Sequence, residues 1–119
     1  MRFMSVIYAD ESQGQPPQAL MDAMDKLIER STKSGLLVDT GGLAPKATST
    51  RVRAANNKMS VIDGPFSEAK EMVGGYAILE CASKEEAVQA TKDFVQLHLD
   101  HWPGCEVECE VRQIFGPEG

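Results

Sequence analysis

Positive charge is scarce in this sequence, and long apolar runs are absent. Twelve lysine and arginine residues stand against eighteen aspartate and glutamate residues in 119, which gives a net charge of −6. Nucleic-acid-binding proteins carry a basic patch or stripe, so we exclude that class of function. The apolar runs are broken well short of the ~20 residues that a membrane-spanning helix needs. Residues 1–3 lead into a strand-like segment rather than a signal peptide, and no membrane association is expected.

Cysteine is sparse and follows no paired pattern. The three cysteines form no CxxC motif. Cys105 and Cys109 lie four residues apart in an expected strand, about 13 Å between Cα atoms, which is too far for a disulfide. We therefore expect free thiols that pack as small apolar side chains, a usage typical of a reducing cytoplasm. Nucleotide-binding motifs such as GxGxxG or a P-loop are also missing, and we expect no cofactor.

Hydrophobic periodicity and turn signals predict one α+β domain over residues 1–119. Pro16 and Pro17 open the first helix, Gly35 ends it, and a capping box at Ser83 starts the second. The expected strands are 2–9, 36–43, 49–54, 58–63, 72–81 and 107–115, and the expected helices are 16–34 and 83–102. Strand, helix, strand, a hairpin insertion, then strand, helix and strand is the split βαβ, ferredoxin-like order.

Two of the expected strands are apolar on both sides. In residues 2–9, Met4, Val6 and Tyr8 alternate with Phe3 and Ile7, and residues 72–81 show the same property. Two helices cover only one face of such a sheet, and soluble monomers rarely leave a large apolar face bare. We therefore predict a homodimer in which a second copy, related by a two-fold axis, covers the other face. In the single-chain alternative, the hairpin of residues 49–63 folds back over that face.

A turn with a specific sequence follows this hairpin. Residues 63–76 read DGPFSEAKEMVGGY, and residues 41–45 read GGLAP. Together with the strand 107–115, these segments resemble the DGPF branch of the YCII-related family. The resemblance implies a ferredoxin-like fold that pairs into a dimeric α+β barrel with a cleft near the DGPF turn. The best-described branch of the family carries a histidine in its first helix and a nearby aspartate; residues 16–34 contain no histidine here, so that pair is not carried over.

Titratable groups around the DGPF turn are the candidate site. Asp63 and Gly64 form the turn, Lys70 can neutralise an anionic ligand, and the hydroxyl of Tyr76 can enter the same cleft. We predict these four residues as ligand-binding, with Asp63 as a catalytic candidate that accepts a proton or a hydrogen bond. The competing interpretation is structural: an aspartate that caps its own turn, a solvated lysine, and a tyrosine packed in the core.

Two histidines lie three residues apart near the end of the second helix. His98 and His101 have a spacing that can share a metal ion, but no third ligand stands at a recognisable spacing, so no metal is predicted. His98 is the second catalytic candidate, as an acid or base in the pocket. The alternative is that both side chains pack and interact with the helix dipole.

Three functions are compatible with these features. The leading hypothesis is a homodimer that binds a small molecule near the DGPF turn, with acid–base chemistry that needs no cofactor. The second is a non-catalytic regulatory or assembly subunit of another protein, and the third is a cofactor-independent oxygenase, by analogy of fold alone. The sequence leaves open whether the protein is an enzyme.

Overall fold

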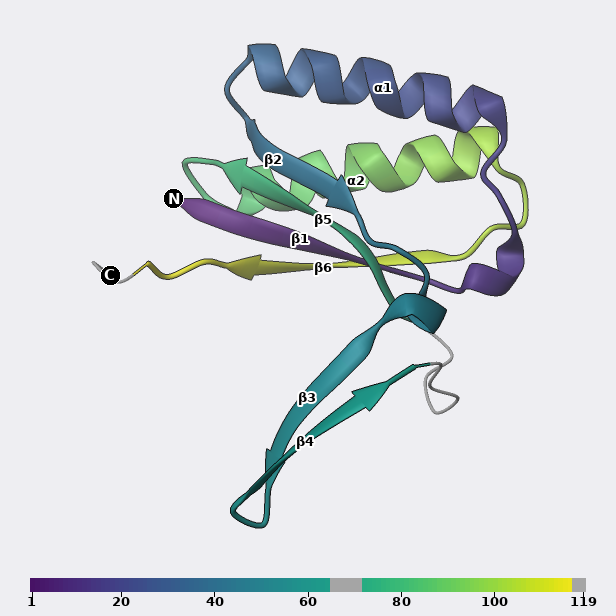
Figure 1. Ribbon diagram of the computed structural model, residues 1–119. Coiled ribbons are helices and arrows are strands. Elements are labelled where there is room, and N and C mark those ends of the chain that lie inside the picture. Colours follow the sequence, from purple (N-terminus) through teal and green to yellow (C-terminus); the bar gives the residue numbers. More distant parts are fainter. Residues whose placement is uncertain (65–71, 117–119) are drawn as a thin grey trace.

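A computed structural model describes residues 1–64 and 72–116 (Figure 1). The order of elements matches the expected one, and their ends agree within one or two residues. The strands are β1 (Arg2–Ala9), β2 (Leu37–Gly42), β3 (Thr50–Ala55), β4 (Lys58–Asp63), β5 (Met72–Glu80) and β6 (Val107–Gln113). The helices are α1 (Gln18–Lys33) and α2 (Lys84–His101), with short 3₁₀ turns η1 (Glu11–Gln13) and η2 (Lys46–Thr48). The sequence also predicts a short helical turn at residues 67–71, which lie outside the described residues.

Four strands form one antiparallel sheet in the order β2-β5-β1-β6. Strand β5 lies between β1 and β2, which is the split βαβ arrangement that the element order predicts. Both helices lie on one face of this sheet, and the hairpin of β3 and β4 extends to the other side (Figure 1). The α+β class and the hairpin insertion are therefore confirmed.

Local sequence signals explain where the elements begin and end. Gly35 follows α1 with φ +83° and supplies the left-handed residue that commonly ends a helix. The Ser83 hydroxyl accepts a hydrogen bond from the Glu86 N–H and caps α2. Asn56 and Asn57 join β3 to β4 with φ 54° and 62°, so the expected hairpin of residues 49–63 is confirmed, with a two-residue turn.

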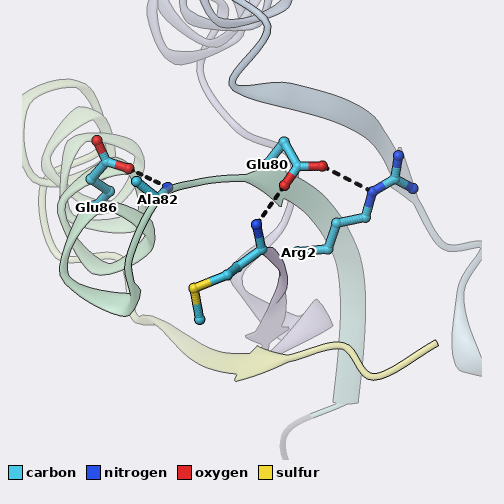
Figure 2. Close-up of polar contacts among 5 residues, drawn as sticks. Arg2, Glu80, Ala82 and Glu86 are labelled. Atoms are coloured by element: carbon cyan, nitrogen blue, oxygen red, sulfur yellow. Dashed lines mark hydrogen bonds and ion pairs between the residues drawn. The ribbon is translucent and has the colours of Figure 1, made fainter. Parts of the chain in front are cut away.

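Two carboxylates hold the connection between β5 and α2 (Figure 2). Glu80 accepts hydrogen bonds from the N-terminal ammonium at 2.8 Å and from Arg2 Nε at 3.4 Å. Glu86 accepts from the Ala82 N–H at 2.6 Å, one residue earlier than a standard capping box would place this bond. These contacts tie the start of the chain to the start of α2.

The register of the sheet separates a covered face from an open face. On the covered face, Phe3 of β1 pairs with Leu79 of β5, and both are buried against the helices. The open face is defined by the central side chains that point away from the helices: Met4, Val6, Tyr8, Tyr76 and Ile78. A bulge after Ile7 pairs Tyr8 with Val73, so the simple alternation expected in β5 stops at Gly75. The hairpin strands pair with each other and do not cover this face as the single-chain alternative required.

Candidate functional site

One end of the sheet carries a cleft of about 520 Å³, which we call the end cleft. Here β1 ends and β5 and β6 begin, and the loops that follow β1 and β2 form its walls. The hairpin leaves the body at the same end (Figure 1). The lining residues come from the loop after β1, the segment after β2, the starts of β5 and β6, and the end of α2; those that carry the argument are Asp10, Glu11, Gly74, His98, Trp102 and Glu106. The volume lies within the range of small-molecule sites, roughly 300–1,000 Å³.

The loop after β1 is fixed by hydrogen bonds from its own side chains. The Asp10 carboxylate accepts from the Ser12 N–H at 2.8 Å, and this bond lowers the pKa of Asp10 below its usual value. Glu11 accepts from the Lys46 N–H at 2.8 Å. The side-chain amide of Gln13 both donates to the carbonyl and accepts from the N–H of Glu106. The cleft is therefore preformed, because its two loop walls are bonded to backbone on either side.

His98 is the titratable side chain that reaches the cleft from the interior. It is only 8% exposed, and its ring packs on that of Phe94 with centroids 4.7 Å apart. Its Nδ1 lies 3.1 Å from the Phe94 carbonyl oxygen. A carbonyl only accepts, so Nδ1 must carry the proton and, in the neutral ring, Nε2 holds the free lone pair. Nε2 has no partner among the described residues and is not sealed in the interior, and His98 is one of the residues that line the end cleft.

The lining of the cleft is acidic and partly aromatic. Asp10, Glu11 and Glu106 contribute three carboxylates, and the indole of Trp102 lies at the same end of α2. Among the described residues that line the cleft there is no lysine or arginine. This charge distribution favours a ligand that offers hydrogen-bond donors or positive charge over an anionic one. A binding role for Lys70 would instead predict an anionic ligand.

The structure does not gather the predicted site residues in one place. Asp63 is exposed at the base of the hairpin, where it accepts a hydrogen bond from the Thr50 hydroxyl at 2.8 Å. The Gly64 N–H donates to the Ser49 carbonyl at 2.8 Å. Neither residue lines the end cleft, although both lie at the end of the body that carries it. Lys70 lies outside the described residues.

Tyr76 belongs to the open face of the sheet, whereas His98 packs on the covered side. Its hydroxyl donates to Asp39 Oδ2 at 3.2 Å, and the negative charge of Asp39 raises the pKa of Tyr76. Only His98 lines the end cleft among the four predicted site residues that the structure describes, which are Asp63, Gly64, Tyr76 and His98. Sequence reasoning missed Asp10 and Glu11, because isolated acidic residues in loops carry no periodic signal.

The described residues show neither a metal-binding cluster nor an activated thiol. No group of three or more histidine, cysteine, aspartate or glutamate side chains in residues 1–64 and 72–116 is arranged to hold a metal ion. The three cysteines are free, as predicted. Burial raises the pKa of both Cys81 and Cys109, which disfavours the reactive thiolate. Across the described segments, neither helix combines the length and apolarity required to cross a bilayer.

Comparison with known proteins shows a family and a distant relative. The YCII-related domain matches residues 1–101 of this chain. An uncharacterized protein of Rhizobium meliloti (strain 1021) is 26% identical over 98 residues, which cover 78% of this chain and 79% of the relative.

Proposed function

The chain belongs to the YCII-related family, and from its site geometry we propose that it binds a small organic molecule in the end cleft, where His98 exchanges a proton with it. One observation carries the proposal. An imidazole that lines a preformed cleft has its Nδ1 bonded to the Phe94 carbonyl, whereas its Nε2 has no partner among the described residues. Because Nε2 is accessible and unpartnered among the described residues, it is a candidate for contact with a ligand.

The geometry suits a general base that needs no cofactor. The bond to the Phe94 carbonyl fixes both the tautomer and the ring orientation of His98. Nε2 is then oriented to accept a proton from a bound molecule and to return it in a later step. The carboxylates of Asp10 and Glu106 line the same cleft and can accept hydrogen bonds from a bound molecule.

The active form in this proposal is a homodimer. The open face presents five large apolar or aromatic side chains at its centre, and the helices do not cover it. A second copy that packs on this face would remove the patch from both chains at once. Asp63 and Gly64 would then extend the end cleft from the hairpin side.

A thermal-shift screen of metabolites, including amines and uncharged polar compounds, tests the site. A ligand present at about 100 times its Kd stabilises the folded protein by ~2.7 kcal/mol, which raises the Tm of a domain of this size by about 10 °C. His98→Asn keeps a donor for the Phe94 carbonyl and removes Nε2, and we expect it to lose most of the shift. His101→Asn is the matched control on the same helix and should keep it. Equal shifts in both variants would show that His98 is a packing residue only.

One feature favours the alternative of a non-catalytic subunit. A groove between α2 and β6 is lined by apolar side chains that include Val95 and Val111, and Leu99 on its rim is 65% exposed. This patch lies outside the open face and would suit the helix or strand of a partner protein. Under that alternative, Leu99→Glu would abolish the co-purification of a specific partner, whereas His98→Asn would leave it intact.

A further inference from the structure

The hairpin of β3 and β4 has two chemically different faces. Directly paired residues of an antiparallel ladder lie on the same side, so its register assigns each side chain to a face. Three pairs form one side, Thr50 with Asp63, Val52 with Val61, and Ala54 with Met59. The other three form the opposite side, Arg51 with Ile62, Arg53 with Ser60, and Ala55 with Lys58. The first side is apolar along most of its length, and the second is basic.

The apolar side of the hairpin is bare in the single chain. Val52 is 66% exposed, Met59 76% and Val61 64%. A two-stranded hairpin without packing partners is at best marginally stable in water, so this surface needs a cover. The radius of gyration, 16.2 Å, exceeds the ~13.5 Å expected for a compact chain of this length, because the hairpin stands away from the body (Figure 1).

The complementary surface is the open face of the sheet. It is apolar at its centre, and its rim carries Glu108 and Glu110 of β6, which pair with Tyr8 and Val6, together with Asp39 of β2. Glu110 Oε1 lies 3.9 Å from Nε of Arg112 on the same strand. The hairpin of the same chain does not cover this face. Each chain therefore presents two apolar surfaces, one on the hairpin (the arm) and one on the open face of the sheet. Within one chain the arm does not cover the open face.

Charge favours a second copy as the occupant of both surfaces. Residues 49–64 contain two arginines and one lysine against one aspartate, which gives a net charge of +2. The net charge of the whole chain is −6, so the remaining residues together carry −8. A basic arm is attracted to the acidic body of another copy. A strand of six residues is ~20 Å long at ~3.4 Å per residue, and four strands ~4.8 Å apart span ~14 Å. The arm is thus long enough to cross the whole sheet.

We infer that, in the proposed homodimer, the hairpin of each chain crosses the open face of the other copy with Val52, Val61 and Met59 turned inward. This inference rests on the proposed homodimer and specifies which part of the partner covers the sheet. It also places the hairpin base, with Asp63 and Gly64, at the boundary between the two copies. The arms are exchanged reciprocally, as a two-fold axis requires.

Two glutamate substitutions on β4 form a matched test. Val61→Glu places a charge on the apolar side, and Ile62→Glu adds the same charge one residue away, on the basic side beside Arg51. Sedimentation equilibrium should show a dimer for the wild type. It should show an at least about tenfold weaker dimer for Val61→Glu, because an unpaired charge would be buried. Ile62→Glu should remain close to the wild type. Circular dichroism checks that both variants keep the folded body.

A second measurement identifies the contact itself. The two tyrosines of the chain, Tyr8 and Tyr76, both lie on the open face. In a mixed dimer of labelled and unlabelled chains, isotope-filtered NOEs should connect the Met59 methyl group of one copy to a tyrosine ring of the other. If these NOEs are absent and Val61→Glu dimerises as the wild type does, the hairpin does not cover the open face and the inference is wrong. If Val6→Glu fails to dimerise in the same experiments, the homodimer itself is still supported. A wild type that is monomeric at micromolar concentration would contradict both this inference and the proposed homodimer.

Discussion

The close approach of β2 to β5 gives a sharp prediction at Gly75. This residue is buried, and an added Cβ would lie 2.8 Å from the Gly41 carbonyl oxygen of the neighbouring strand. That contact is with backbone, so it is relieved only if the strands separate. Overpacking of this kind costs about 1–3 kcal/mol, offset by ~0.4–1 kcal/mol from the reduced entropy of the unfolded chain. We expect Gly75→Ala to lose about 1–2 kcal/mol.

Thermal unfolding followed by circular dichroism measures this loss. At about 4 °C per kcal/mol for a chain of this length, the Tm of Gly75→Ala should fall by ~4–8 °C. Gly74→Ala is the control, because the nearest atom to its added Cβ is 3.9 Å away, and its Tm should not fall. If Gly75→Ala unfolds at or above the wild-type temperature, the approach of β2 to β5 described here is wrong. The part of the end cleft that is formed by the segment after β2 and the start of β5 would then be misplaced.

Two further predictions concern titration. The hydrogen bond from the N-terminal ammonium holds the pKa of Glu80 below its ordinary value of 4.5. Glu80 therefore adds stability above that pH, and the gain is lost as the pH falls through the lower folded pKa. The difference in Tm between wild type and Glu80→Gln should accordingly narrow on acidification, and a constant difference would contradict the contact. The charge of Asp39 raises the pKa of Tyr76 above 10.0, so in a Tyr8→Phe background Asp39→Asn should lower the midpoint of tyrosinate absorbance. An unchanged midpoint would contradict the hydrogen bond between Tyr76 and Asp39.

Much of the fold could be predicted because its signals are local. The period-two pattern of β6, with Val107 and Cys109 half-buried between exposed glutamates, needs no information from elsewhere in the chain. The asparagines of the hairpin turn and Gly35 after α1 mark conformations that other residues adopt at a cost. The strand order then followed from the order of the elements, since few topologies connect them without crossing.

The candidate site was harder to predict because it depends on distant contacts. Gln13 bonds to Glu106 across 93 residues, and such a side-chain-to-backbone bond leaves no periodic trace in the sequence. Tyr76 was expected beside Asp63, but the register of β5 turns its hydroxyl to the open face and to Asp39. His98 was found from its residue type and its place on the helix. Only the contact with Phe94 shows which ring nitrogen carries the proton in the neutral ring.

The orientation of His98 is the central claim, and NMR tests it directly. A long-range nitrogen–proton correlation spectrum of the histidine side chains distinguishes a protonated ring nitrogen from one that holds a lone pair. For neutral His98 we predict the proton on Nδ1, bonded to Phe94, and the lone pair on Nε2, with the Nε2 resonance shifting when a ligand from the screen is added. A neutral ring that carries its proton on Nε2, or an Nε2 resonance that no binding ligand moves, would contradict the claim.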